Sequence, residues 1–255
     1  MAWKNIEIER RGAVAIVHFD RKGSLNAFSQ ELVLELTEAG QSFHGDLETQ
    51  AVVLAGAPEA FSAGIDLRDR TLWETEKMDD LALRERFYRG VRLCRTWEQM
   101  PQITVAAMER MAVGAGAAMA LACDWRVLGR SAFIYVPEVK IGMNLQWGAL
   151  PRLISLVGPA RAKRITLMCE KMPAEMALDW GLVDELADDG GTVDKALWMA
   201  ETAAGMPAVT VRMVKEAVNA TANALHHTAA YADADQSQLC AGFAEAIAAR
   251  ESFSG

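Results

Sequence analysis

The sequence lacks any long hydrophobic run. Hydrophobic residues make up 51% of its 255 residues, yet no window approaches the roughly 18 continuous apolar residues that a membrane helix needs. Residues 1–9 alternate between polar and apolar types, whereas a signal peptide would begin with a basic patch and continue with an apolar block. We therefore expect a soluble, cytoplasmic protein without a membrane partner.

Cysteine and histidine are few and scattered. The four cysteines form no C-x-x-C pair, and the four histidines include one adjacent pair, His226 and His227. This pattern argues against a disulfide framework and against a metal site. The apolar neighbours of Cys123 are typical of a small core residue, so we expect neither a metal nor a resident cofactor.

An excess of positive charge is also missing. The chain has 26 Lys and Arg against 34 Asp and Glu, which gives a formal net charge of −8, and the basic residues are dispersed. Such a chain repels a phosphate backbone. We therefore expect no nucleic-acid partner.

Strand and helix signals alternate through the first half of the chain. Strands are expected at residues 6–9, 14–19, 51–56, 103–108 and 125–128. Helices are expected from a Ser29 cap to Gly40, from 79 to 100, and from 112 to 123. This βαβ rhythm predicts an α/β fold with a mostly parallel sheet.

The strand signal disappears from about Thr192. Residues 193–204, 209–222 and 223–250 are rich in alanine and carry apolar stripes, which predicts three helices. A chain of 255 residues forms one large domain or a domain with an extension. We divide it into a core, residues 1–190, and a C-terminal helical region, residues 191–255.

Two segments can present backbone N–H groups to a ligand. Residues 60–67 form a small-residue turn after a buried strand, although an ordinary connection looks the same. Residues 112–118 contain Gly114 and Gly116 at a helix start, where free N–H groups stabilise an oxyanion. Tight packing of small residues against a sheet is the alternative.

A third segment, residues 134–142, places Glu138 within an apolar stretch. Burial there would raise the pKa of the carboxyl group and make it a proton shuttle near neutral pH. The alternative is a solvated glutamate paired with Lys140.

Together, the order and spacing of these segments resemble the crotonase superfamily of enoyl-CoA hydratases and isomerases. The resemblance continues in residues 25–27, 122–126, 156–162, 174–177 and 180–184. It implies an α/β fold with a crotonase-like ββα spiral core and a C-terminal helical oligomerisation region. It also implies an acyl-CoA enzyme of the kind found in fatty acid metabolism.

The resemblance assigns roles to individual positions. The backbone N–H groups of Ile65 and Ala115 would form an oxyanion hole for the thioester carbonyl, and Glu138 would be the catalytic acid and base. Ala27, Ala63, Asp66 and Leu67 match positions that contact CoA, which enters as part of the thioester substrate.

One departure from the family pattern decides which of the family's reactions we favour. Ala118 stands where hydratases with the full pattern carry a second glutamate. A single base suffices to move a double bond from the 3 to the 2 position, so a Δ3-Δ2 enoyl-CoA isomerase is favoured. The alternatives are a single-glutamate hydratase, another acyl-CoA lyase or hydrolase, and a non-catalytic CoA-binding protein. In a hydratase, Tyr135, Asn144, Gln146 or Trp147 would hold the water.

A second departure is Glu109-Arg110, where relatives often have Asn-Gly. It either changes only a strand end or adds a charge pair beneath the helix start, and we favour a structural role. Trp73, Met143 and Trp147 are candidates to line an apolar acyl pocket or to cover the core.

In this superfamily the C-terminal helices build homotrimers, often paired into hexamers. Phe243 and Arg250 would lie on the helix that approaches a neighbour's CoA, or belong to an ordinary packing helix. We expect a surface or interface role for His226 and His227.

Overall fold

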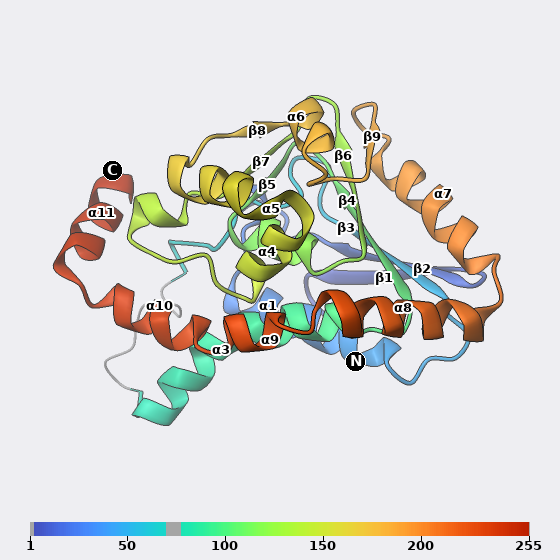
Figure 1. Ribbon diagram of the computed structural model, residues 1–255, viewed down its shortest axis with the longest axis horizontal. Helices are drawn as coiled ribbons and strands as arrows, with labels where there is room; N and C mark the ends of the chain where they lie inside the picture. The colour runs from blue at the N-terminus through green and yellow to red at the C-terminus, as the bar shows by residue number, and fades with distance from the viewer. Residues whose placement is uncertain (1–2, 70–77, 255) are drawn as a thin grey trace.

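The computed structural model describes residues 3–69 and 78–254, and within them the strands form two sheets (Figure 1). The larger sheet has the order β1-β2-β3-β4-β6-β9, and the smaller has the order β5-β7-β8. The larger sheet consists of β1 (Ile6–Arg11), β2 (Val14–Phe19), β3 (Ala51–Ala55), β4 (Ile103–Met108), β6 (Trp125–Gly129) and β9 (Glu185–Ala187). The smaller consists of β5 (Met111–Val113), β7 (Phe133–Tyr135) and β8 (Met172–Pro173). Only β1–β2 and β7–β8 pair antiparallel, so the mostly parallel sheet predicted from the sequence is confirmed.

Helices cover both faces of the larger sheet, with α1 and α4 on one face and α7 on the other. The described helices are α1 (Gln30–Phe43), α3 (Asp80–Glu98), α4 (Ala115–Leu121), α5 (Ala149–Met168), α6 (Ala174–Asp179), α7 (Thr192–Ala204), α8 (Ala208–Ala222), α9 (His226–Ala230), α10 (Asp233–Ala241) and α11 (Ala244–Ser254). Two short 3-10 helices, η1 (Ser24–Asn26) and η2 (Glu138–Ile141), complete the described elements. Among the described residues, no helix is both long enough and apolar enough to cross a membrane.

The central strands of the larger sheet, β2, β3, β4 and β6, are buried on both faces, as in parallel sheets generally. Successive side chains point to opposite faces, so Val17 and Leu54 join one hydrophobic core while Ile16 and Val53 join another. The first core includes α1 and α4, and the second is closed by α7. The sheet is thereby held rigidly between two helical layers, and the loops at its edge can position a site.

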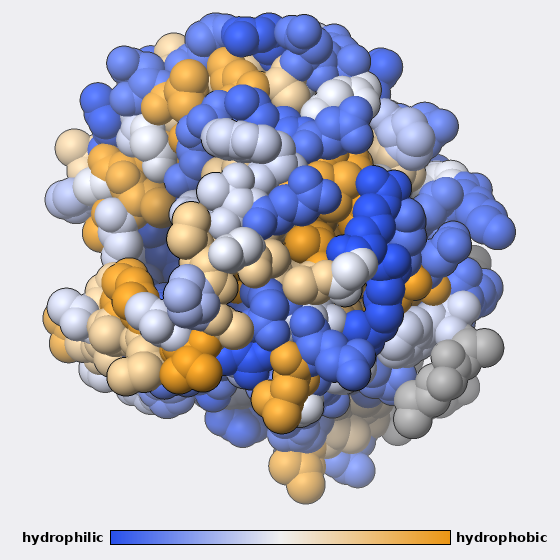
Figure 2. Space-filling model, turned by 90° about the vertical axis from the view of Figure 1, so that its right-hand side faces the viewer, coloured by the Kyte–Doolittle hydropathy of each residue, from blue (hydrophilic) through white to orange (hydrophobic). Residues whose placement is uncertain are grey.

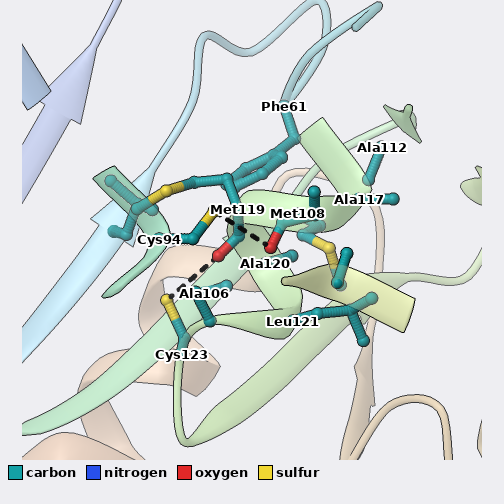
Figure 3. Close-up of a cluster of buried hydrophobic side chains, with 14 of the residues drawn as sticks. Phe61, Cys94, Ala106, Met108, Ala112, Ala117, Met119, Ala120, Leu121 and Cys123 are labelled. Carbon is teal, nitrogen blue, oxygen red and sulfur yellow. Dashed lines mark hydrogen bonds between the residues drawn. The ribbon is translucent and has the colours of Figure 1, made fainter. Parts of the chain in front are cut away.

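The first core packs tightly around α4, whose residues are mostly small. Figure 3 shows Phe61, Met108 and Met119 clustered there with the cysteines. The Cys94 thiol donates to Ala118 O at 3.6 Å, and burial raises its pKa to about 12. A thiol with so high a pKa is unreactive at neutral pH, so Cys94 is a core residue.

Several sequence predictions are confirmed at the level of single residues. Ser29 caps α1, because its side chain accepts a hydrogen bond from the Leu32 N–H at 3.2 Å. The predicted end of this helix at Gly40 is wrong, since α1 continues to Phe43. Gly40 serves packing instead: a Cβ there would lie 2.9 Å from Trp97 Nε1.

Two other helix predictions need correction. The helix expected from residue 112 begins at Ala115, because Ala112 pairs with Ile134 in the smaller sheet and Gly114 has a left-handed φ of 49°. The single helix expected over 223–250 is divided into α9, α10 and α11. The chain turns before α10 and places Asp233 and Ser237, both buried, against the loop at residues 144–148.

Candidate active site

Glu138 lies at the start of η2, directly after β7 and Pro137. Its Oε2 is buried and has no hydrogen-bond partner among the described residues. Burial raises the pKa of this carboxyl group to about 7. Lys140 does not neutralise it, because no ion pair joins Glu138 and Lys140 in the described part of the chain, and the Lys140 ammonium lies over the Tyr135 ring instead, 5.9 Å from its centre. The interpretation of Glu138 as a solvated partner of Lys140 is therefore wrong.

Gly114 makes room for the Glu138 carboxylate. A Cβ at Gly114 would lie 2.6 Å from Glu138 Oε1, and the positive φ of 49° is one that only glycine adopts easily. Glu138 is thus pressed against the start of α4. The Gly114 N–H donates to Tyr135 O at 2.8 Å, which ties the two segments together.

Two backbone N–H groups, those of Ile65 and Ala115, have no hydrogen-bond acceptor among the described residues. Ile65 forms a parallel bridge with Phe28, in which Phe28 bonds to the two neighbours of Ile65: its N–H donates to Gly64 O, and its carbonyl oxygen accepts from the Asp66 N–H. The N–H of Ile65 itself has no acceptor among the described residues. Ala115 is the first residue of α4, where an N–H has no intrahelical acceptor. Its φ remains negative, as a non-glycine residue prefers. Gly64, with a φ of 96°, packs against Val113 O and brings the two segments together.

A cavity of about 160 Å³, which we call the inner cavity, brings these groups together. Glu138, Ile65 and Ala115 all line it. Ala118 lines it too and is 2% exposed, so the position of the missing second glutamate faces the cavity. The remaining wall is mostly apolar and includes Val113, Tyr135, Ile141, Met143, Leu145, Gln146 and Trp147.

The residues predicted to surround Glu138 do not all line the inner cavity. Met143, Gln146 and Trp147 line the inner cavity, and the Trp147 indole fits against α3 where a Cβ at Gly90 would lie only 1.9 Å away. Asn144 does not line it; its Nδ2 donates to Asp233 O at 3.3 Å. Trp73 lies outside the described residues.

A second cavity of about 750 Å³, the outer cavity, adjoins the inner one. Ala63, Ile65 and Leu67 line both, so the 62–67 loop forms their common wall. The other predicted CoA positions, Ala27 and Asp66, line the outer cavity together with the basic residues Lys22 and Arg68.

Arg21 fixes this loop, although the sequence alone does not point to this residue. Its Nη1 donates to Ala27 O at 2.9 Å and to Asp66 Oδ2 at 2.6 Å. Asn26 supports the same loop by donating to Phe19 O and Phe61 O. No local sequence signal reveals the Arg21–Asp66 pair, because its members are 45 positions apart.

The C-terminal helices of this chain also reach the site. Helix α10 packs beside α3 (Figure 1). Helix α11 contacts η2. Ser237 Oγ accepts from Gln146 Nε2 at 2.9 Å, and Asp233 Oδ2 accepts from the Gly148 N–H at 3.0 Å. Phe243 is 53% exposed, and Arg250 donates to Ala241 O within the same region.

Glu109 has a structural role, as expected, but of a different kind. Its Oε1 accepts from the Thr192 N–H at 3.1 Å and from Thr192 Oγ1 at 2.7 Å. It thereby caps the N-terminus of α7, where a negative charge is favourable. No ion pair between Glu109 and Arg110 is found in the described part of the chain.

Known proteins share this sequence pattern and fold. Residues 9–251 match the enoyl-CoA hydratase/isomerase family. A probable mitochondrial enoyl-CoA hydratase of Dictyostelium discoideum is 31% identical over 84% of this chain and 74% of its own length. The 1,2-epoxyphenylacetyl-CoA isomerase of Escherichia coli is 31% identical over 81% of this chain and 78% of its own. A crystal structure of an enoyl-CoA hydratase from Mycobacterium avium subsp. paratuberculosis has a TM-score of 0.87 at 24% identity, covering 99% of this chain and 96% of that one. The predicted α/β fold with a crotonase-like core and a helical C-terminal region is confirmed.

The contact between Gly114 and Glu138 should be measurable as a coupling between the effects of two substitutions on stability. Gly114→Ala should lower the free energy of unfolding by about 1–3 kcal/mol for its sparsely populated backbone conformation, with φ 49° and ψ −111°, plus about 1–3 kcal/mol for the clash with Glu138. In a Glu138→Ala background the second part should disappear. Urea unfolding of both single variants and the double variant measures this coupling.

Gly12→Ala is the matched control, because Gly12 has a φ of 60° and an added Cβ there meets nothing within 4 Å. Its cost should be the same with and without Glu138. Equal costs of Gly114→Ala in the two backgrounds would show that the carboxylate does not lie against Gly114.

Proposed function

Because this chain belongs to the enoyl-CoA hydratase/isomerase family, we propose that it moves the double bond of a 3-enoyl-CoA thioester to the 2 position. The chain is an enzyme of the crotonase superfamily, and the family includes both hydratases and isomerases. One observation supports the choice of this reaction over the others. Among the described residues lining the inner cavity, only Glu138 has a carboxyl group, and Ala118 faces the same space.

The thioester carbonyl would lie between the N–H groups of Ile65 and Ala115. These donors are free among the described residues and line the inner cavity, so they can stabilise the negative charge that develops on the carbonyl oxygen. The rest of CoA would extend into the outer cavity, past Ala63 and Leu67 toward Ala27 and Asp66. Lys22 and Arg68 line that cavity and offer positive charge to the phosphates.

Glu138 would carry the proton between two carbons. Its carboxylate takes a proton from carbon 2, and the electron pair of that C–H bond moves into the enolate. The resulting carboxylic acid then returns the proton to carbon 4, which leaves the double bond between carbons 2 and 3. A pKa of about 7 suits both steps, since the group is then a competent base and a competent acid near neutral pH.

Hydration of a 2-enoyl-CoA is the second candidate. Several relatives are named enoyl-CoA hydratases, and Gln146 places a polar group in the inner cavity that can hold a water molecule. This reaction requires that Glu138 and the carboxamide together replace a second glutamate at Ala118.

Paired 3-enoyl-CoA and 2-enoyl-CoA substrates of several chain lengths separate the two reactions. We expect 3-enoyl substrates to become 2-enoyl products without uptake of water. Glu138→Gln should lower kcat by roughly 10²–10⁴-fold, because the amide cannot take up the proton. Chromatography of the products and the initial rates measure both effects.

Glu175→Gln is the matched control, since Glu175 lies on α6 with 71% of its side chain exposed and lines neither cavity. It should leave the rate unchanged. Reaction of 2-enoyl substrates alone, with uptake of water, would favour hydration instead. Tight CoA binding without any turnover would contradict both reactions.

We also propose that the chain assembles into a homotrimer or a hexamer of paired trimers. Exposed apolar side chains on and between α7 and α8 support this proposal: Trp198, Met206, Val209 and Met213. On the face shown in Figure 2, which is the right-hand side of Figure 1, groups of hydrophobic residues lie among hydrophilic ones. An apolar cavity of about 860 Å³ also remains between α8 and the core.

Sedimentation equilibrium measures the assembly directly. The expected mass is three or six times the chain mass of 27.8 kDa. A mass equal to that of one chain at micromolar concentration would contradict the proposal.

A further inference from the structure

The carboxamide of Gln146 is held in one orientation at the inner cavity. Its Nε2 donates to Ser237 Oγ at 2.9 Å, and Ser237 on α10 is fully buried. Its Oε1 is buried and has no hydrogen-bond partner among the described residues. A helix from the far end of the chain thus positions a polar group that the proposed proton transfer does not use.

Two unpartnered oxygen atoms therefore belong to residues of the same cavity wall, Glu138 Oε2 and Gln146 Oε1. The first is accounted for by the proton that Glu138 carries. A buried acceptor without a partner is costly and rare in folded proteins, so the second also calls for a partner. Because the surrounding wall is mostly apolar, the substrate is the natural source of that partner.

The wall restricts the chemistry of the partner group. No described residue lining the inner cavity carries a positive charge, which disfavours a carboxylate on the acyl chain. An ammonium group would lose its hydration without gaining a full set of acceptors. A hydroxyl group fits, because it is neutral and donates one hydrogen bond.

We propose that Gln146 is a specificity-determining residue that binds a hydroxyl group on the acyl chain, beyond the carbons that react. The assignment of the reacting carbons rests on the proposed function, which places carbons 2 to 4 at Glu138. Glu138 lies against Gly114 at the start of α4, whereas the Gln146 amide is tied to α10. Because different elements hold the two groups, our proposal assigns the hydroxyl to carbons beyond those that react.

Binding of unreactive ligands tests this assignment without any turnover. Isothermal titration calorimetry would compare octanoyl-CoA with octanoyl-CoA that carries one hydroxyl group, at carbon 3 or at each of carbons 5 to 8. We expect one of the distal hydroxyls to lower Kd about tenfold or more relative to octanoyl-CoA, as one satisfied buried hydrogen bond does. Gln146→Met keeps the length of the side chain and should reduce this preference to about one.

Two further variants make the result specific. Ser237→Ala frees the amide without removing it, so the preference should fall part of the way. Asn144→Leu is the matched control, because Asn144 is an amide in the same loop that does not line the inner cavity. It should leave the preference unchanged. Each preference is a ratio of two Kd values for one variant, so a loss of folded protein does not alter it.

Three outcomes would overturn the assignment: no preference for any hydroxyl, the same preference in Gln146→Met, or a preference confined to carbon 3. In the last case the amide holds the oxygen that hydration adds, and the proposed double-bond shift is contradicted as well. A distal preference in a protein that does not shift double bonds would refute the proposed reaction alone.

Discussion

Burial of the Glu138 carboxyl group, one oxygen of which has no hydrogen-bond partner among the described residues, is the constraint on which the rest of the site depends. Gly114 leaves room for one carboxyl oxygen, and the second has no partner among the described residues. Helix α11 packs closely against the end of η2, the short helix that begins with Glu138, since a Cβ at Gly142 would lie 2.3 Å from the Ala246 backbone. Burial disfavours the charged carboxylate and raises the pKa of Glu138 to about 7. A carboxyl group with this pKa can both take up and release a proton near neutral pH.

The C-terminal helices are part of this enclosure as well as of the outer surface. Asp233 is 7% exposed, its pKa is raised to about 6 by burial, and it accepts the Gly148 N–H beside the cavity loop. Ser237 orients Gln146 from the same helix. Folding of α10 and α11 onto the core therefore shapes the cavity in which Glu138 acts, which links the stability of the C-terminal region to the chemistry of the site.

Sequence patterns predict the parts of this structure that depend on local chemistry. The strands 14–19 and 103–108, the Ser29 cap and the apolar setting of Glu138 all follow from short-range patterns. Features that depend on distant contacts were not predictable. Gly40 was taken for a helix end because its contact with Trp97 is invisible in the sequence, and the helix over 223–250 breaks where Asp233 meets Gly148. The pairing of Arg21 with Asp66 likewise depends on a contact between residues that are distant in the sequence.

The difference in unfolding free energy between the Glu138→Gln variant and the unaltered protein, measured by urea unfolding from pH 4 to pH 9, tests this constraint most directly. The pKa of Glu138 is about 7 in the folded chain and near 4.5 when unfolded, so the folded state holds the proton more tightly. The unaltered protein should lose stability relative to the variant as the pH rises from about 4.5 to about 7, by up to about 3 kcal/mol, and the difference should then stay constant. A difference that does not change with pH would mean that Glu138 has an ordinary pKa and that its carboxyl group is solvated.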